Sequence, residues 1–267
     1  MGLVILLMVG FCFILAFVGG ANGMIMPVPH EYGSVIIRNF SEQAGLGAVR
    51  FDHWLHRALY TCRLCHVDIG FAMEANATKI DAPTILKGFY CGSCHNGTRT
   101  RVYGSQKIFA ACSLSATPGE DTRCSRCHSM GKKVQKEYDY ASFTEKLPKK
   151  NLWNLVDWED AEARGFIRPI DFLPGISIQR PSLTLQKDFS IPSRGGWMSE
   201  IIFSHKKHAR WNGCEVCHPD IFPSVKKGTV KYSMLQVCDG QYCGVCHDRV
   251  AFPLNDCQKC HTNPVRR

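Results

Sequence analysis

The sequence predicts a mainly helical or irregular fold, built from two copies of one module with little regular secondary structure: short helices, turns and one small hairpin in each copy. A segment from Phe51 to His95 recurs 152 positions later without a gap, so that Phe51 corresponds to Phe203. Each copy is part of a set of three Cys-x-x-Cys-His motifs. Once the first 23 residues are set aside, roughly 41 residues remain for each motif, which is little chain for an ordinary apolar core.

Each Cys-x-x-Cys-His motif is the attachment signal for a c-type haem. Its two cysteines can form thioethers with the vinyl groups on one edge of a porphyrin, and the histidine that follows lies under the iron. Chance gives roughly 0.03 such motifs at this composition, whereas the chain holds six. Disulfide frameworks and zinc ribbons also use cysteine pairs, but neither requires a histidine after each pair.

We therefore expect six covalently attached haem c groups that supply much of the core. Each module should depend on its haems for folding, as other small domains depend on disulfides or structural metal ions. The attachment residues are twelve cysteines: Cys62, Cys65, Cys91, Cys94, Cys124, Cys127, Cys214, Cys217, Cys243, Cys246, Cys257 and Cys260. The proximal iron ligands are six histidines: His66, His95, His128, His218, His247 and His261.

One further histidine pair precedes the first motif of each copy, at the same offset: His53 with His56 in the first copy and His205 with His208 in the second. Residues three apart on a helical turn share a face, so each pair can present two imidazoles toward two irons. A lone histidine is more often a surface or core residue. Two pairs at equivalent positions favour distal iron ligation instead.

The pattern Phe-x-His-x-x-His, followed by three motifs of which the second reads Tyr-Cys-Gly-x-Cys-His, resembles the triheme cytochrome c7 domain, a relative of tetrahaem cytochrome c3. The resemblance covers about 51–128 and 203–261. It implies four axial pairs: His53 with His66, His56 with His95, His205 with His218, and His208 with His247. In that family a histidine or methionine in the loop before the second motif binds the third haem.

Neither of those loops contains a histidine here, but each contains one methionine, Met73 or Met234, at different registers. Methionine usually fills gaps in a core, yet a thioether also replaces a distal imidazole. We expect Met234 to bind the haem of His261 and Met73 to bind the haem of His128. His30, otherwise a surface residue, is the rival ligand in the first module.

The first 23 residues are uncharged and largely apolar, and they end in Ala21-Asn22-Gly23. This pattern indicates a signal peptide, although the basic start is missing and the apolar run is nearly long enough to span a bilayer. A cleaved signal and a retained membrane anchor both stay open. Either one places the haem modules in the periplasm or at the surface of a bacterium.

The chain divides into a signal peptide or anchor (1–23), a lead-in (24–50), the first module (51–128), a connector (129–202) and the second module (203–267). An insert at about 97–121 in the first module is expected to be a surface loop. Capping residues predict a short helix over 157–165, and the apolar connector is expected to pack across both modules. Cys112 and Cys238 are expected to be free, buried thiols, with a disulfide between them as the alternative.

The formal charge of +9 does not indicate nucleic acid, because the haem propionates bring the oxidised protein to about +3. Haems with two histidine ligands have no open site, so we expect an electron carrier for redox partner proteins, either other cytochromes or a membrane oxidoreductase, and not an enzyme. The alternatives are a multihaem reductase that uses an open third haem, and a subunit of a cytochrome filament or of a membrane quinol-oxidising complex.

Overall fold

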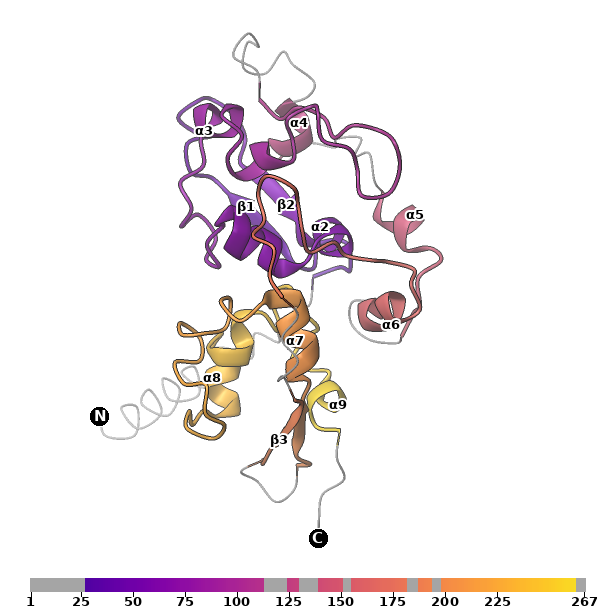
Figure 1. Cartoon of the computed structure of the whole chain (residues 1–267), viewed down its shortest axis with the longest axis vertical. Helices are drawn as coiled ribbons and strands as arrows, with labels where there is room; N and C mark the ends of the chain where they lie inside the picture. The colour runs from indigo at the N-terminus through magenta and orange to yellow at the C-terminus, as the bar shows by residue number, and fades with distance from the viewer. Residues whose placement is uncertain are drawn as a thin grey trace, which may run out of the picture.

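The computed structural model describes residues 27–112, 124–129, 139–150, 155–181, 187–193 and 198–262. Two bodies of short helices and turns lie one above the other, with the connector helices beside them (Figure 1). Each body contains one two-stranded sheet. The prediction of a mainly helical or irregular fold with little regular secondary structure is confirmed.

The first module begins with a hairpin that leads directly into the first histidine pair. β1 (Ser34–Ile37) pairs antiparallel with β2 (Val49–Asp52), and α2 (His53–Leu59) follows without a break. The first motif lies on a short π-helix, η1 (Leu64–Ile69). Next come α3 (Ala82–Leu86), the 3-10 helix η2 (Tyr90–Ser93) at the second motif, and α4 (Cys124–Cys127) at the third.

The second module repeats this order of elements, except that its first motif forms turns instead of a π-helix. β3 (Phe189–Ile191) pairs with β4 (Ile201–Phe203), and α7 (His205–Asn212), α8 (Met234–Cys238), η3 (Tyr242–Val245) and α9 (Cys257–Cys260) follow. The strands β1 and β3 belong to segments that the sequence assigned to the lead-in and the connector. Each module therefore begins one strand earlier than the repeat alone indicates.

The glycine of each second motif is required by the packing of the preceding helix. A Cβ atom on Gly92 would lie 1.9 Å from the carbonyl oxygen of Ile85 in α3, and one on Gly244 would lie 1.9 Å from that of Val237 in α8. Both helices begin behind a reciprocal capping box, which fixes their first turns. The helix and the second motif thus form one compact unit in each module.

The connector contributes α5 (Tyr140–Thr144) and α6 (Trp158–Ala163). α6 is the predicted short helix, since the Asp157 side chain accepts a hydrogen bond from the backbone N–H of Asp160 and Gly165 follows the helix with φ +78°. Buried residues of α2 and the connector form one apolar cluster: Trp54, Ala58, Leu147, Val156, Trp158, Ala161 and Ile167. The connector is therefore part of the core of the first module.

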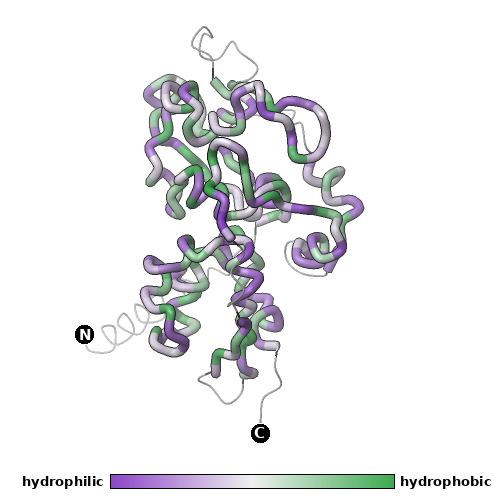
Figure 2. Tube along the Cα trace, viewed as in Figure 1, coloured by the Kyte–Doolittle hydropathy of each residue, from purple (hydrophilic) through white to green (hydrophobic). Residues whose placement is uncertain are grey.

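Polar contacts join the same connector helix to the second module. Glu162 accepts a hydrogen bond from the indole N–H of Trp211 at 2.8 Å and pairs with Arg210. Glu159 pairs with Lys207. The expectation that the connector packs across both modules is confirmed. Figure 2 shows short apolar stretches interleaved with polar ones throughout, as expected of modules with small cores.

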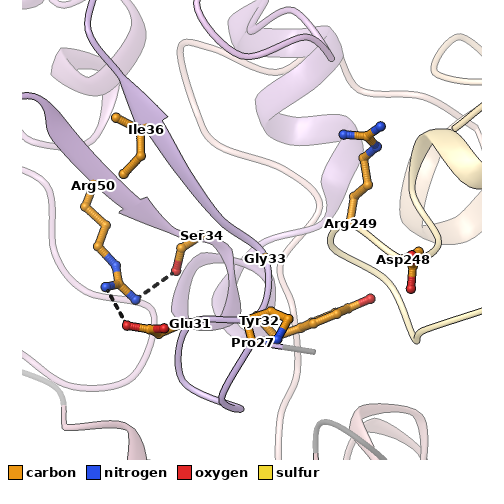
Figure 3. Close-up of a pocket in the computed structure, with 9 residues that line it drawn as sticks. All are labelled: Pro27, Glu31, Tyr32, Gly33, Ser34, Ile36, Arg50, Asp248 and Arg249. Atoms are coloured by element: carbon orange, nitrogen blue, oxygen red, sulfur yellow. Dashed lines mark hydrogen bonds and ion pairs between the residues drawn. The ribbon is translucent and has the colours of Figure 1, made fainter. Parts of the chain in front are cut away.

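The modules also touch directly, beside a cavity of about 430 Å³. In Figure 3, Glu31 and Arg50 lie at one side of this cavity, Asp248 and Arg249 of the second module lie at the other, and the ring of Tyr32 extends toward the second module. The hydroxyl of Tyr32 donates to the carbonyl oxygen of Ala251 at 2.5 Å. These contacts set the lead-in against the second module.

The insert in the first module is not simply a surface loop. The ring of Phe109 lies 4.5 Å from that of His95, and the backbone N–H of Ala111 donates to the His95 carbonyl at 2.9 Å. The insert therefore folds back onto the second motif, where Phe109 contacts the imidazole of His95 much as Phe252 contacts that of His247 in the other module. Residues 113–123 lie outside the described part of the chain.

No helix within the described ranges is long and apolar enough to cross a membrane. Residues 1–23 lie outside those ranges, so the signal peptide and the anchor both stay predictions.

Candidate haem sites

Three of the four implied axial pairs come together in space. The ring centres of His53 and His66 are 6.5 Å apart, with planes 6° from parallel. The corresponding distances are 6.4 Å for His56 with His95 and 6.3 Å for His208 with His247. A metal bonded to two opposite imidazoles, at about 2 Å from each nitrogen, holds their ring centres about 6 Å apart. The residues present therefore fit an iron between the members of each pair.

The fourth implied pair is not brought to this spacing. His205 contacts Phe189 and Phe203, at ring-centre distances of 5.8 and 5.9 Å. The part of the second module that the structure describes gives no ring contact between His205 and His218. Ligation of one iron by these two histidines stays a prediction.

Backbone carbonyls orient most of these imidazoles through the nitrogen that faces away from the expected iron. A carbonyl oxygen only accepts, so Nδ1 carries the proton and Nε2 keeps the lone pair for a metal. The Nδ1-to-oxygen distances are 2.7 Å for His53 to Gly33, 2.9 Å for His66 to Phe71, 3.0 Å for His208 to Ser204, 2.6 Å for His218 to Phe222 and 3.2 Å for His247 to Phe252. Sequence reasoning missed these acceptors, because a carbonyl carries no residue-specific signal.

Burial keeps three of the imidazoles neutral. It lowers the pKa of His53, His56 and His247 to about 4. Only a neutral imidazole can donate its nitrogen lone pair to a metal. At neutral pH these side chains are ready to bind iron.

The third motif of each module is tied to the loop of its own hairpin. The Nδ1 atom of His128 lies 2.7 Å from the carbonyl oxygen of Gly47, and that of His261 lies 2.7 Å from the carbonyl oxygen of Ser199. Gly47 and Ser199 are themselves 152 positions apart. The hairpins are therefore part of the candidate haem sites, since each orients the histidine of the third motif.

The expected distal ligands of the third haems lie at the surface. Met73 is 41% exposed in a turn, and Met234 is 50% exposed at the start of α8. His30 is exposed as well, with its Nε2 atom 3.9 Å from a carboxylate oxygen of Glu31. The distal ligand of each third haem stays a prediction.

The described cysteines are all free, and they do not converge on a common centre. No group of three or more His, Cys, Asp or Glu side chains that could hold a metal ion occurs among the described residues, whereas a structural zinc site needs four ligands. Burial raises the pKa of Cys65, Cys91 and Cys246 to about 12, which disfavours a nucleophilic thiolate. Cys112 and Cys238 are free, as expected, but Cys112 is only partly buried and Cys238 is exposed, so the prediction that both are buried is wrong.

Comparison with solved structures finds two fragments of one multihaem protein. The C-terminal hexaheme fragment of GSU1996 is 22% identical, with 86% of this chain and 96% of that chain covered and a TM-score of 0.26. The N-terminal hexaheme fragment of GSU1996 is 21% identical, with 87% and 99% covered and a TM-score of 0.23. These TM-scores are too low to compare the arrangement of the modules. No curated protein matches the chain.

A profile of the family described as cytochrome c7 and related cytochrome c matches the chain twice, over residues 49–129 and 201–262. The two matches cover both modules and together span more than half of the chain. They agree with the irregular fold, the hairpins and the histidine pairs described above. The chain belongs to the cytochrome c7 family and carries two such domains in tandem.

Proposed function

We propose that this multihaem cytochrome is an electron carrier with six covalently attached haems, one at each Cys-x-x-Cys-His motif. The observation that carries the proposal is the spacing of three imidazole pairs, whose ring centres lie 6.5, 6.4 and 6.3 Å apart. Each pair joins a motif histidine to a histidine of α2 or α7. Bound haem supplies a one-electron iron couple, and the protein supplies its position and surroundings.

In this proposal His53, His56, His205 and His208 are the distal ligands, as the family pattern implies. Two phenylalanines hold these rings in place. The ring of Phe51 lies 4.8 Å from His53 and 4.3 Å from His56, and the ring of Phe203 lies 4.5 Å from His208. Apolar contact on one side and a carbonyl hydrogen bond on the other limit rotation of the imidazole and keep water away.

Met234 and Met73 are proposed as the distal ligands of the third haems. Tyr232 supports the assignment in the second module. Its ring stacks on that of Tyr242, the residue before Cys243, with the ring centres 5.0 Å apart. The segment that carries Met234 therefore runs beside the second motif. A thioether ligand raises the haem potential relative to a second imidazole, so these haems would be the high-potential members of the set.

We propose that the protein works outside the cytoplasm, in the periplasm or at the cell surface, and exchanges electrons with other redox proteins. Multihaem c-type cytochromes are typically exported, and the uncharged segment 1–23 agrees with export. Whether the segment is cleaved or retained decides between a free and a membrane-attached carrier.

Intact-mass measurement of the purified native protein tests the haem count. Six haem additions are expected, and fewer on correctly matured protein would contradict the proposal. Replacement of Cys214 and Cys217 by alanine should remove one haem. Cys238→Ala is the matched control, because this cysteine is exposed and lies outside every motif.

Carbon monoxide binding separates the carrier from a reductase. Carbon monoxide binds ferrous haem only where an axial position is open, so a carrier with six complete ligand sets should not bind it in the native state. Binding at a third-motif haem would favour the reductase alternative.

A further inference from the structure

The first motifs of the two modules face each other across the module junction. Arg63, between Cys62 and Cys65, packs against Gly213, the residue before Cys214. A Cβ atom on Gly213 would lie 2.5 Å from Cδ of Arg63. A side chain at position 213 would have to displace that of Arg63, so the glycine lets the two segments approach this closely. The attachment segment of His66 therefore lies beside that of His218.

A connector arginine bridges these two segments. The Arg180 guanidinium donates from Nη1 to an Asp68 carboxylate oxygen at 2.7 Å and from Nε to a Glu215 carboxylate oxygen at 3.2 Å. Asp68 lies two residues after His66, and Glu215 lies between Cys214 and Cys217. One side chain thus holds one carboxylate from the first motif region of each module.

The bridge is protected from water on the side of the first module. The side chain of Asp68 is only 1% exposed, so its contact with Arg180 is less screened than a surface ion pair. Its equivalent in the second module, Asp220, is exposed. The bridge is therefore a feature of the junction and not a contact that each module repeats internally.

Charge complementarity makes the junction specific. Arg63 and Glu215 occupy equivalent positions of the repeat with opposite charges. Arg63 pairs with the connector residue Asp171, with Nη2 and a carboxylate oxygen 2.6 Å apart, whereas Glu215 pairs with Arg180. If the two motif segments exchanged places, Arg63 would meet Arg180 and Glu215 would meet Asp171. Repulsion between these like charges disfavours that arrangement.

We propose that Arg180, Asp68 and Glu215 form a clamp that fixes the first motif of one module against the first motif of the other. The haems of His66 and His218 then form the junction at which the two modules exchange electrons. This inference rests on the proposed function. It assigns Arg180 a positioning role, because its side chain acts through the two motif segments.

Arg180→Gln tests the clamp, with Arg164→Gln as the matched control. Arg164 is an exposed connector arginine whose contacts among the described residues stay within the connector: an ion pair with Asp160 at 3.5 Å and a cation–π contact with Phe166. The readout is the redox interaction between individual haems, followed through haem-methyl NMR signals during a reductive titration. Arg180→Gln should weaken the interaction between the haems of His66 and His218 and leave interactions inside each module unchanged. Arg164→Gln should change neither.

Glu215→Gln gives a second, milder variant. The Glu215 side chain is about half exposed, and its replacement removes only the longer of the two contacts that Arg180 makes. Glu215→Gln should therefore cause a smaller loss of the same interaction, and it tests the clamp even if Arg180→Gln fails to fold. Equal titrations for Arg180→Gln and Arg164→Gln would overturn the inference. So would a wild-type titration in which another pair of haems carries the strongest coupling between modules. A protein with fewer than six haems by mass would instead overturn the proposed function.

Discussion

Helices α2 and α7 present the same His-x-x-His pair in the two modules but are held by different forces. α2 buries Trp54 and Ala58 in the apolar cluster with the connector. The equivalent positions on α7 are Lys206 and Arg210, and α7 has no buried residue. Its contacts with α6 are instead ion pairs and the hydrogen bond from Trp211.

This difference separates the residues that hold haem from those that hold the modules together. The histidine pair, the phenylalanine that precedes it and the second-motif glycine are the same in both modules, because each belongs to a candidate haem site. The other helix faces differ because the connector meets one apolar helix and one basic helix. The repeat therefore preserves chemistry at the sites, while the connector makes the two copies structurally unequal.

Removal of the second histidine of each pair should have the largest effect on the haem spectrum. His56→Ala should perturb the haem of His95 more than that of His66, and His208→Ala should perturb the haem of His247, because those rings lie together. Site-resolved NMR of the haem methyl groups measures both. A shift confined to the first haem of the module would show that the pairing is wrong.

Removal of the apolar contact of α2 should affect stability more than the equivalent change on α7. Trp54→Ala should lower the free energy of unfolding by about 3–5 kcal/mol, as expected for a buried aromatic residue. Lys206→Ala, at the equivalent position of α7, should have little effect. Denaturant unfolding followed by circular dichroism measures the difference, and equal losses would show that the two helices are held alike.

A methyl group on the second-motif glycines should affect the two modules equally. Gly92→Ala and Gly244→Ala should each cost about 1–3 kcal/mol, because the new carbon meets a helix carbonyl oxygen that cannot easily move. The same unfolding measurement applies. A large effect in one module alone would mean that the helix and motif are not packed alike in the two copies.

Loss of a connector carboxylate should give the smallest effect and weaken only the contact with the second module. Glu162→Gln removes the ion pair with Arg210 and weakens the hydrogen bond from Trp211, for a loss of about 1 kcal/mol. Added salt should reduce the difference from wild type, because the ion pair is partly exposed. A loss that is independent of salt would point to packing rather than charge.

The sequence by itself determined the features that depend on residues close together in the chain. The Cys-x-x-Cys-His spacing, the histidine pairs and the recurrence of the segment 51–95 after 152 positions predict the haem chemistry and the family. The capping residues around 157–165 predict α6. These signals are local, because thioether attachment, a shared helical face and a helix cap each involve neighbouring residues. The small hairpin expected in each module is present, but the positions of its strands escaped prediction, because β1 and β3 are only four and three residues long, too few to show an alternating pattern.

Only the tertiary structure decided how the local units meet. The carbonyl groups of Gly33, Gly47 and Ser199 orient histidines far along the chain, and every residue has a carbonyl that could do so. The bridge from Arg180 spans 112 positions to Asp68 and 35 to Glu215. No pattern in the sequence specifies such distant partners, because the free energy of these contacts depends on the path of the whole chain between them.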